Sequence, residues 1–153
     1  NCRRTNLLLN LLLAMKHRPI SKGLIIVAAS SAMFGPLLKP LDSAQRNELE
    51  LSWPGPNTWL VPNRGLYPDW ITGESDEIAI RVTSAPALAL LSYRLGRPVV
   101  STSANPAGAQ PARHSFQVVR YFGRGLVRAP GVVDLEASPS TIRRVGTGEV
   151  LRA

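Results

Sequence analysis

The unbroken apolar run at residues 23–28, Gly-Leu-Ile-Ile-Val-Ala, constrains the fold more than any other feature of this sequence. A strand with one solvated face alternates apolar and polar side chains, so a continuous run predicts a strand that is buried on both faces. Pro19 precedes it and disfavours helical backbone at the residue before, which ends the helix predicted over residues 5–17. The chain must therefore surround this strand with other elements.

Those elements mix helices and strands along the whole chain. Asp42 caps a helix that runs to about Leu51, with Gln45 in the capping-box position. Further helices are predicted over residues 31–38, 84–96 and 115–122, and further strands over residues 58–61, 77–82, 98–101, 141–145 and 149–152. Since no repeat or linker is present, we predict a single domain over residues 1–153, of the α/β (α+β) class, around a mixed sheet.

Charge and cysteine content limit the partners. The 18 Lys and Arg against 10 Asp and Glu give a formal charge of +8, which favours an anionic partner such as nucleotide, RNA or acidic membrane. Cys2 is the single cysteine, so no internal disulfide can form, and a reducing, cytoplasmic compartment fits. Because only His17 and His114 accompany it, we expect no metal site built from protein ligands.

The leucine-rich start resembles a signal peptide only superficially. Asn10 interrupts the run, cations follow it at residues 16–18, and no small-residue cleavage site is present. The run is also much shorter than the roughly 20 residues that cross a bilayer. We therefore expect a buried amphipathic helix with no membrane association. Because the chain begins at Asn1 rather than Met, we also expect residues upstream of it.

The common phosphate-binding motifs are absent. The sequence has neither a G-x-x-x-x-G-K-[ST] loop nor G-x-G-x-x-G after a strand, and its two histidines offer no Ser-His-Asp arrangement. Any phosphate must then be bound by scattered cations and loop amides. Lys16, Arg18 and Lys22 are such cations, located between the first helix and the buried strand. They either bind an anion or complement the dipole at the helix C-terminus.

Two further groups of residues are candidates for ligand contact. Arg81 lies in the apolar strand at residues 77–82, and a buried guanidinium needs a partner. It either pairs with Glu77 or Asp76 or binds a substrate carboxylate through two hydrogen bonds. The segment 101–108, Ser-Thr-Ser-Ala-Asn-Pro-Ala-Gly, follows a strand, where short polar side chains suit ligand contact in open α/β sheets. The alternative is an ordinary Asx or ST turn.

These groups, in this order, resemble the YrdC-like family, the threonylcarbamoyl-adenylate synthases, in its single-domain form. That family carries a K-x-R-P segment before an apolar strand, a W-P-G-P-x-T turn, an A-[IV]-R strand, an S-x-S-A-N-x-x-G loop, and a terminal S-x-I followed by L-R. Here the motifs lie at residues 16–19, 53–58, 79–81, 101–108, 140–142 and 151–152. Short motifs in the right order are far more specific than any one of them.

The resemblance implies a twisted mixed sheet flanked by helices, with a positively charged concave face. It also implies a reaction in which L-threonine, bicarbonate and ATP, with Mg²⁺ accompanying the ATP, give threonylcarbamoyl-AMP and diphosphate. Downstream transferase proteins would use this product to form threonylcarbamoyladenosine in tRNA. The carbamate of threonine attacks the α-phosphate of ATP, so positioning and charge neutralisation supply most of the catalysis, and no side chain is assigned a covalent role.

Matching positions imply two sets of site residues. The set implied for ATP is Lys16, Arg18, Thr102, Asn105 and Arg152. The set implied for L-threonine is Arg81, Ser103 and Ser140.

The sequence departs from the family in two places. The family begins with a strand and a P-T-E-[TA]-x-x-[YF]-G-[LV] segment that nothing here matches. We therefore expect an N-terminally truncated domain, and a loss of activity is one expected consequence of the truncation. Glu77 stands where many members carry a small hydroxyl residue, which would weaken a local phosphate contact.

Two other functions stay open on the sequence. One is the carbamoyl-adenylate-forming domain of hydrogenase-maturation carbamoyltransferases, although those large chains carry zinc-finger-like cysteines. The other is a non-catalytic module that binds double-stranded RNA or tRNA, as in ribosomal RNA maturation. The charge of +8 supports RNA binding, whereas aromatic residues make up only 6% of the chain, few for base stacking.

Overall fold

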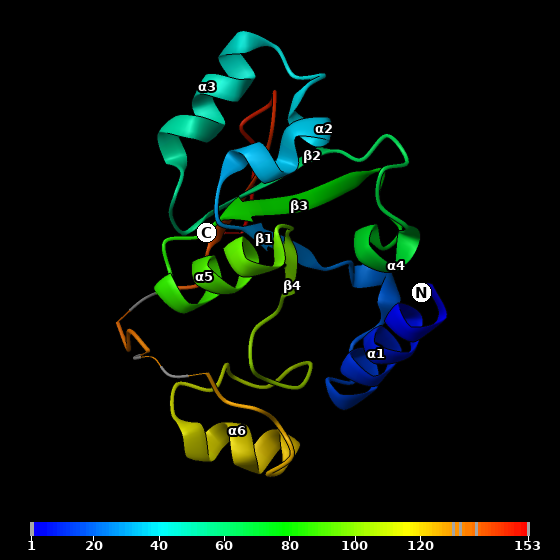
Figure 1. The fold of residues 1–153 in the computed structure, drawn as a ribbon, viewed down its shortest axis with the longest axis vertical. Coiled ribbons are helices and arrows are strands. Elements are labelled where there is room, and N and C mark those ends of the chain that lie inside the picture. Colours follow the sequence, from blue (N-terminus) through cyan, green and yellow to red (C-terminus); the bar gives the residue numbers. More distant parts are fainter. Residues whose placement is uncertain (1, 130, 132, 137, 153) are drawn as a thin grey trace.

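A mixed sheet of order β4-β1-β3-β2-β5-β6 forms the centre of the protein (Figure 1). The computed structural model describes residues 2–129, 131, 133–136 and 138–152, with side chains from Leu7 onward. The strands are β1 (Ile25–Ala28), β2 (Asn57–Pro62), β3 (Glu77–Val82), β4 (Val99–Ser101), β5 (Thr141–Arg144) and β6 (Val150–Arg152). The helices are α1 (Cys2–Met15), η1 (Ile20–Lys22), η2 (Ser31–Phe34), α2 (Gly35–Leu38), α3 (Ser43–Ser52), α4 (Asp69–Thr72), α5 (Pro86–Leu95) and α6 (Ser115–Phe122).

The strand pairing is both parallel and antiparallel, which confirms the predicted mixed sheet. β1 runs parallel to β3, and β2 runs parallel to β5. The pairs β1–β4, β2–β3 and β5–β6 are antiparallel. The predicted α/β class is therefore confirmed.

Several predicted elements have the observed bounds or nearly so. The strand β3 and the helix α6 coincide with the predictions. The capping box of α3 is formed, because Asp42 Oδ1 accepts from Gln45 N at 2.8 Å and Gln45 Oε1 accepts from Asp42 N at 3.1 Å. The helix α1 ends at Met15, before the predicted His17, because His17 adopts a left-handed φ of 48°.

Other elements differ from the sequence predictions. The helix predicted over residues 31–38 has those bounds but is divided: a 3₁₀ turn, η2, precedes α2, which begins at Gly35-Pro36. The short elements η1 and α4 were not predicted. They pack against each other through Gly73, whose φ is 71° and where a Cβ would lie 2.2 Å from Ser21 O. This close packing, which only glycine permits, orients the segment that follows Arg18.

One face of the sheet carries the hydrophobic core. On β3, Ile78, Ile80 and Val82 are buried and alternate with half-buried residues, as the period of a strand requires. Helices α1, α2 and α3 pack their apolar side chains against this face. The core also contains Leu9, Leu13, Leu24, Ile26, Ala28, Phe34, Leu37, Leu38, Leu41, Leu49, Trp53, Trp59, Val61, Ile71 and Val145.

The opposite face of the sheet is more open. It carries Ile25 of β1 and the odd-numbered residues of β3, including Arg81, all of them half-buried. Helix α5 contacts β1, and Ser92 Oγ accepts a hydrogen bond from Ala29 N at 3.2 Å. Among the described residues, no helix is long and apolar enough to cross a membrane.

Candidate functional site

A cavity of about 440 Å³ opens on the sheet face opposite the core. Residues from the β1 segment, β3, the end of β4 and the segment after it, the segment before β5, and β6 line it. It brings together six of the eight residues that the resemblance implies: Arg18, Arg81, Thr102, Ser103, Ser140 and Arg152. Lys16 and Asn105 do not line this cavity.

Arg81 faces the cavity without a protein partner. Its Nε is buried and has no hydrogen-bond partner among the described residues. The carboxylate of Glu77 instead accepts from Arg144 Nε at 3.0 Å, so the predicted alternative pairing of Arg81 with Glu77 is not formed. Burial, and then the charge of Arg152, lower the pKa of Arg81. A buried donor without an acceptor is expected where an anionic ligand binds.

Arg18 lies at the edge of the same cavity. Its Nη2 donates to Gly23 O at 3.0 Å and to Lys22 O at 3.3 Å, which fixes the guanidinium against the turn after η1. Burial, followed by the charge of Arg152, lowers the pKa of Arg18. Arg18 therefore holds its charge near Arg152 even though the two repel each other, an arrangement that an anion between them would stabilise.

Arg152 is fixed by a buried hydroxyl cluster. It donates to Ser140 O at 2.7 Å and 3.0 Å, and its Nη2 also lies 3.0 Å from Ser140 Oγ. Thr58 Oγ1, which is fully buried in β2, donates to Ser140 Oγ at 3.0 Å. The cluster joins β2, β6 and the residue before β5. Thr58 was not singled out from the sequence, although it belongs to the W-P-G-P-x-T motif.

Lys16 binds the backbone of the loop that follows β4. Its side chain is buried, with 4% exposed, and Nζ donates to Ser103 O and to Asn105 O, the latter at 2.5 Å. Ala107 N donates to Lys16 O at 2.7 Å, and the ring centroid of Phe122 lies 5.8 Å from Nζ. Lys16 thus connects α1, the loop and α6.

Asn105 stabilises the same loop from within. Its Nδ2 donates to Ala109 O at 2.7 Å and to Pro106 O at 3.0 Å. Its Oδ1 is buried and has no partner among the described residues, which leaves one acceptor available. The loop is therefore more than a simple turn: a lysine and an asparagine hold its backbone while Thr102 and Ser103 line the cavity.

Cations dominate the cavity lining. Four arginines face it, the three above and Arg113, which sequence reasoning missed although it follows the loop by only a few residues. The carboxylate in the lining is that of Asp134. Among the described residues, no group of three His, Cys, Asp or Glu side chains could hold a metal ion. Guanidinium groups pair with carboxylates and phosphates through two parallel hydrogen bonds.

The fold and this cavity define a small α/β protein with a cavity whose arginines and loop hydroxyls suit an anionic ligand. Residues 3–153 match the model of the Sua5, YciO and YrdC family, which is described as "Telomere recombination". The chain belongs to this family.

Relatives in the family agree on one name. The chain is 49% identical over 142 residues to a threonylcarbamoyl-AMP synthase of Cellvibrio japonicus, covering 92% of this chain and 75% of that one. It is 46% identical over 142 residues to the synthase of Nitrosococcus oceani, covering 92% and 77%.

Solved structures show the same fold. The crystal structure of P. abyssi Sua5 complexed with L-threonine superposes with a TM-score of 0.78 at 25% identity, over 89% of this chain and 40% of that chain. The solution structure of the MTH1692 protein from Methanobacterium thermoautotrophicum gives a TM-score of 0.69 at 29% identity, over 95% and 69%.

Proposed function

We propose that this protein is a threonylcarbamoyl-AMP synthase, which converts L-threonine, bicarbonate and ATP to threonylcarbamoyl-AMP, diphosphate and water. The observation that carries the proposal is the cavity lined by Arg18, Arg81 and Arg152, none of which forms an ion pair with a carboxylate among the described residues. The reaction brings together a carboxylate and a triphosphate, which need cations of this kind. The name shared by the relatives supports the same reaction.

The side chains divide by their position in the cavity. Arg81, on the sheet, binds the threonine carboxylate, and the hydroxyls of Ser103 and Ser140 contact the same substrate. Arg18 and Arg152 bind phosphate oxygens of ATP together with Thr102. As the carbamate oxygen attacks the α-phosphate, the arginines neutralise the charge that develops on diphosphate. The protein supplies orientation and charge and forms no covalent bond to substrate.

Lys16 and Asn105 serve ATP binding indirectly, by holding the loop that carries Thr102 and Ser103. The one carboxylate that lines the cavity among the described residues, that of Asp134, gives too few ligands for a protein-held ion, so Mg²⁺ would be bound by the phosphates of ATP. Its chemistry would be charge neutralisation on those phosphates.

The test is diphosphate release from ATP by the complete gene product, measured with and without L-threonine plus bicarbonate. Release that needs both co-substrates supports the proposal, and L-serine in place of threonine is the matched control. Release that follows carbamoyl phosphate and ignores threonine would establish the hydrogenase-maturation chemistry instead. RNA binding without any ATP consumption would establish the non-catalytic module.

The proposed function places the protein in a larger process. Threonylcarbamoyl-AMP is an activated intermediate, so we propose that downstream transferase proteins consume it to modify tRNA. With Cys2 as the single cysteine, the chain suits the reducing cytoplasm where tRNA is modified. RNA is accordingly the macromolecular partner that we propose.

A further inference from the structure

A second basic surface lies outside the cavity, around α6. Residues 78–133 contain no Asp or Glu, whereas arginine occurs four times around α6, at Arg113, Arg120, Arg124 and Arg128. All four side chains are exposed. Ion pairs among the described residues form only at Arg144, so none neutralises these arginines. We call residues 113–128 the α6 surface.

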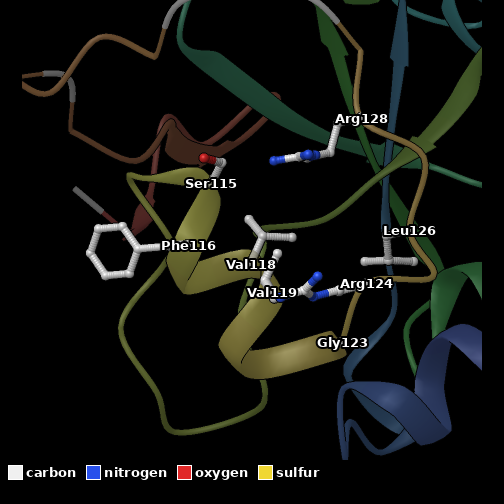
Figure 2. A pocket seen from close by; sticks show the side chains of 8 residues that line it. All are labelled: Ser115, Phe116, Val118, Val119, Gly123, Arg124, Leu126 and Arg128. Carbon is white, nitrogen blue, oxygen red and sulfur yellow. The ribbon is translucent and has the colours of Figure 1, made fainter.

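The α6 surface includes a hollow of about 390 Å³ between the helix and residues 123–128, which follow it. Val118, Val119 and Leu126 give it an apolar floor, and Arg124 and Arg128 lie at separate points of its rim (Figure 2). Helix α6 buries none of its side chains fully, although its pattern is strongly amphipathic. Cations around an apolar floor suit a ligand with anionic groups and flat apolar parts.

A stacked pair of rings lies at the start of α6. The rings of His114 and Phe116 are parallel within 8°, with centroids 5.5 Å apart, and Phe116 is 66% exposed. Figure 2 shows Phe116 projecting from the side of α6 that faces away from Arg124. An exposed planar pair is a surface on which an unpaired base can stack, here on the flank of α6 opposite Arg124.

We propose that the α6 surface binds RNA, with Arg120, Arg124 and Arg128 on backbone phosphates and an unpaired base stacked on Phe116. Arginine and an exposed ring pair favour RNA over an acidic lipid surface, because α6 is a single helix of eight residues, short for a helix that lies in a membrane interface. This inference deepens the proposed function by locating its RNA partner. The surface adjoins the cavity through Arg113, so bound RNA would lie beside the site where the activated intermediate forms.

The experiment measures fluorescence anisotropy of a labelled RNA stem-loop at a series of salt concentrations, without ATP or threonine. The double variant Arg124→Gln/Arg128→Gln should weaken binding about tenfold and reduce the slope of log K against log salt by about 1.5, since two phosphate contacts are lost. Phe116→Ala should weaken binding to the stem-loop by about tenfold and leave binding to a fully paired duplex unchanged.

The matched control is Arg94→Gln/Arg97→Gln on and after α5, which removes the same charge from exposed positions elsewhere in the acid-free segment. The inference is overturned if this control weakens RNA binding as much as Arg124→Gln/Arg128→Gln does. It is also overturned if the protein binds vesicles of anionic phospholipid through these arginines and does not bind RNA. Arg81→Met separates the two proposals, because it should raise the KM for threonine in diphosphate release and keep RNA binding.

Discussion

The carboxylate of Glu77 bonds to Arg144, across the neighbouring strand β2, and not to Arg81 on its own strand. This pairing keeps the acid at the start of β3 from neutralising Arg81 on the same strand. Arg81 is left with a buried Nε that has no partner among the described residues. Its positive charge is therefore available to an anionic ligand in the cavity. An ion pair outside the cavity thus keeps the charge inside it available.

Arg81→Met should separate activity from stability. Losing a charge-assisted pair of hydrogen bonds costs about 2–3 kcal/mol, so the KM for threonine should rise roughly 30- to 100-fold. The thermal midpoint should not fall, because the variant removes a buried polar atom that has no partner. Steady-state kinetics and calorimetry measure the two effects. Arg81→Lys keeps the charge without the fork and should recover only part of the affinity; an unchanged KM in Arg81→Met would refute the assignment.

Arg144→Ala should inhibit ATP binding from a distance. Without Arg144 the Glu77 carboxylate loses its ion pair. Glu77 lines a second pocket next to the cavity, and Arg18 and Arg152 line both, so the free carboxylate would compete with phosphate for these arginines. We expect the KM for ATP to rise about fivefold, as a nearby like charge opposes a bound anion. Adding Glu77→Gln to Arg144→Ala should restore the KM. If the double variant is as weak as the single one, Arg144 acts in some other way.

Ser140→Ala should destabilise the fold through Thr58. The Thr58 hydroxyl is fully buried and would lose its acceptor, at a cost of about 1–3 kcal/mol. Combining Ser140→Ala with Thr58→Val removes both partners and should recover most of that loss. Urea unfolding of the four proteins in this cycle measures the coupling. Strictly additive single effects would show that the two hydroxyls do not interact.

The buried Lys16 should make the free energy of unfolding change with pH in the alkaline range. Burial, and then the charge of Arg18, lower the pKa of Lys16 below its ordinary 10.5. Between the lowered pKa and 10.5 the unfolded chain binds more protons than the folded one, so the free energy of unfolding rises with pH there. The difference in free energy of unfolding between the wild-type protein and Lys16→Gln should therefore grow as pH is raised from neutral toward 10.5. Urea titrations check this; a difference that shrinks would contradict it.

Local signals predicted much of the fold. The capping box at Asp42 and the alternation along β3 depend on neighbours in the sequence, and both appear as expected. The elements η1 and α4 were not predictable in the same way, because each has at most four residues and is held by the contact between Ser21 and Gly73.

The sequence allowed most residues of the site to be predicted, but not the contacts between them. The motifs identified three of the four arginines that line the cavity, and the hydroxyls of Thr102, Ser103 and Ser140. They could not show that Lys16 points at the carbonyl groups of Ser103 and Asn105, because that contact joins residues nearly 90 positions apart. The ligand contacts of these residues, and the P-T-E segment expected ahead of the chain, stay predictions.

The cavity has one more consequence, which follows from how its lining is distributed along the chain. Arg18, Arg81 and Arg152 come from the beginning, middle and end of the sequence, so the anion site exists only when folding is complete. A ligand that binds only the native state stabilises it by mass action, by about 2.7 kcal/mol at a hundred times its Kd. The cellular concentration of ATP would therefore set how much of this protein escapes unfolding and proteolysis, in addition to how fast it works.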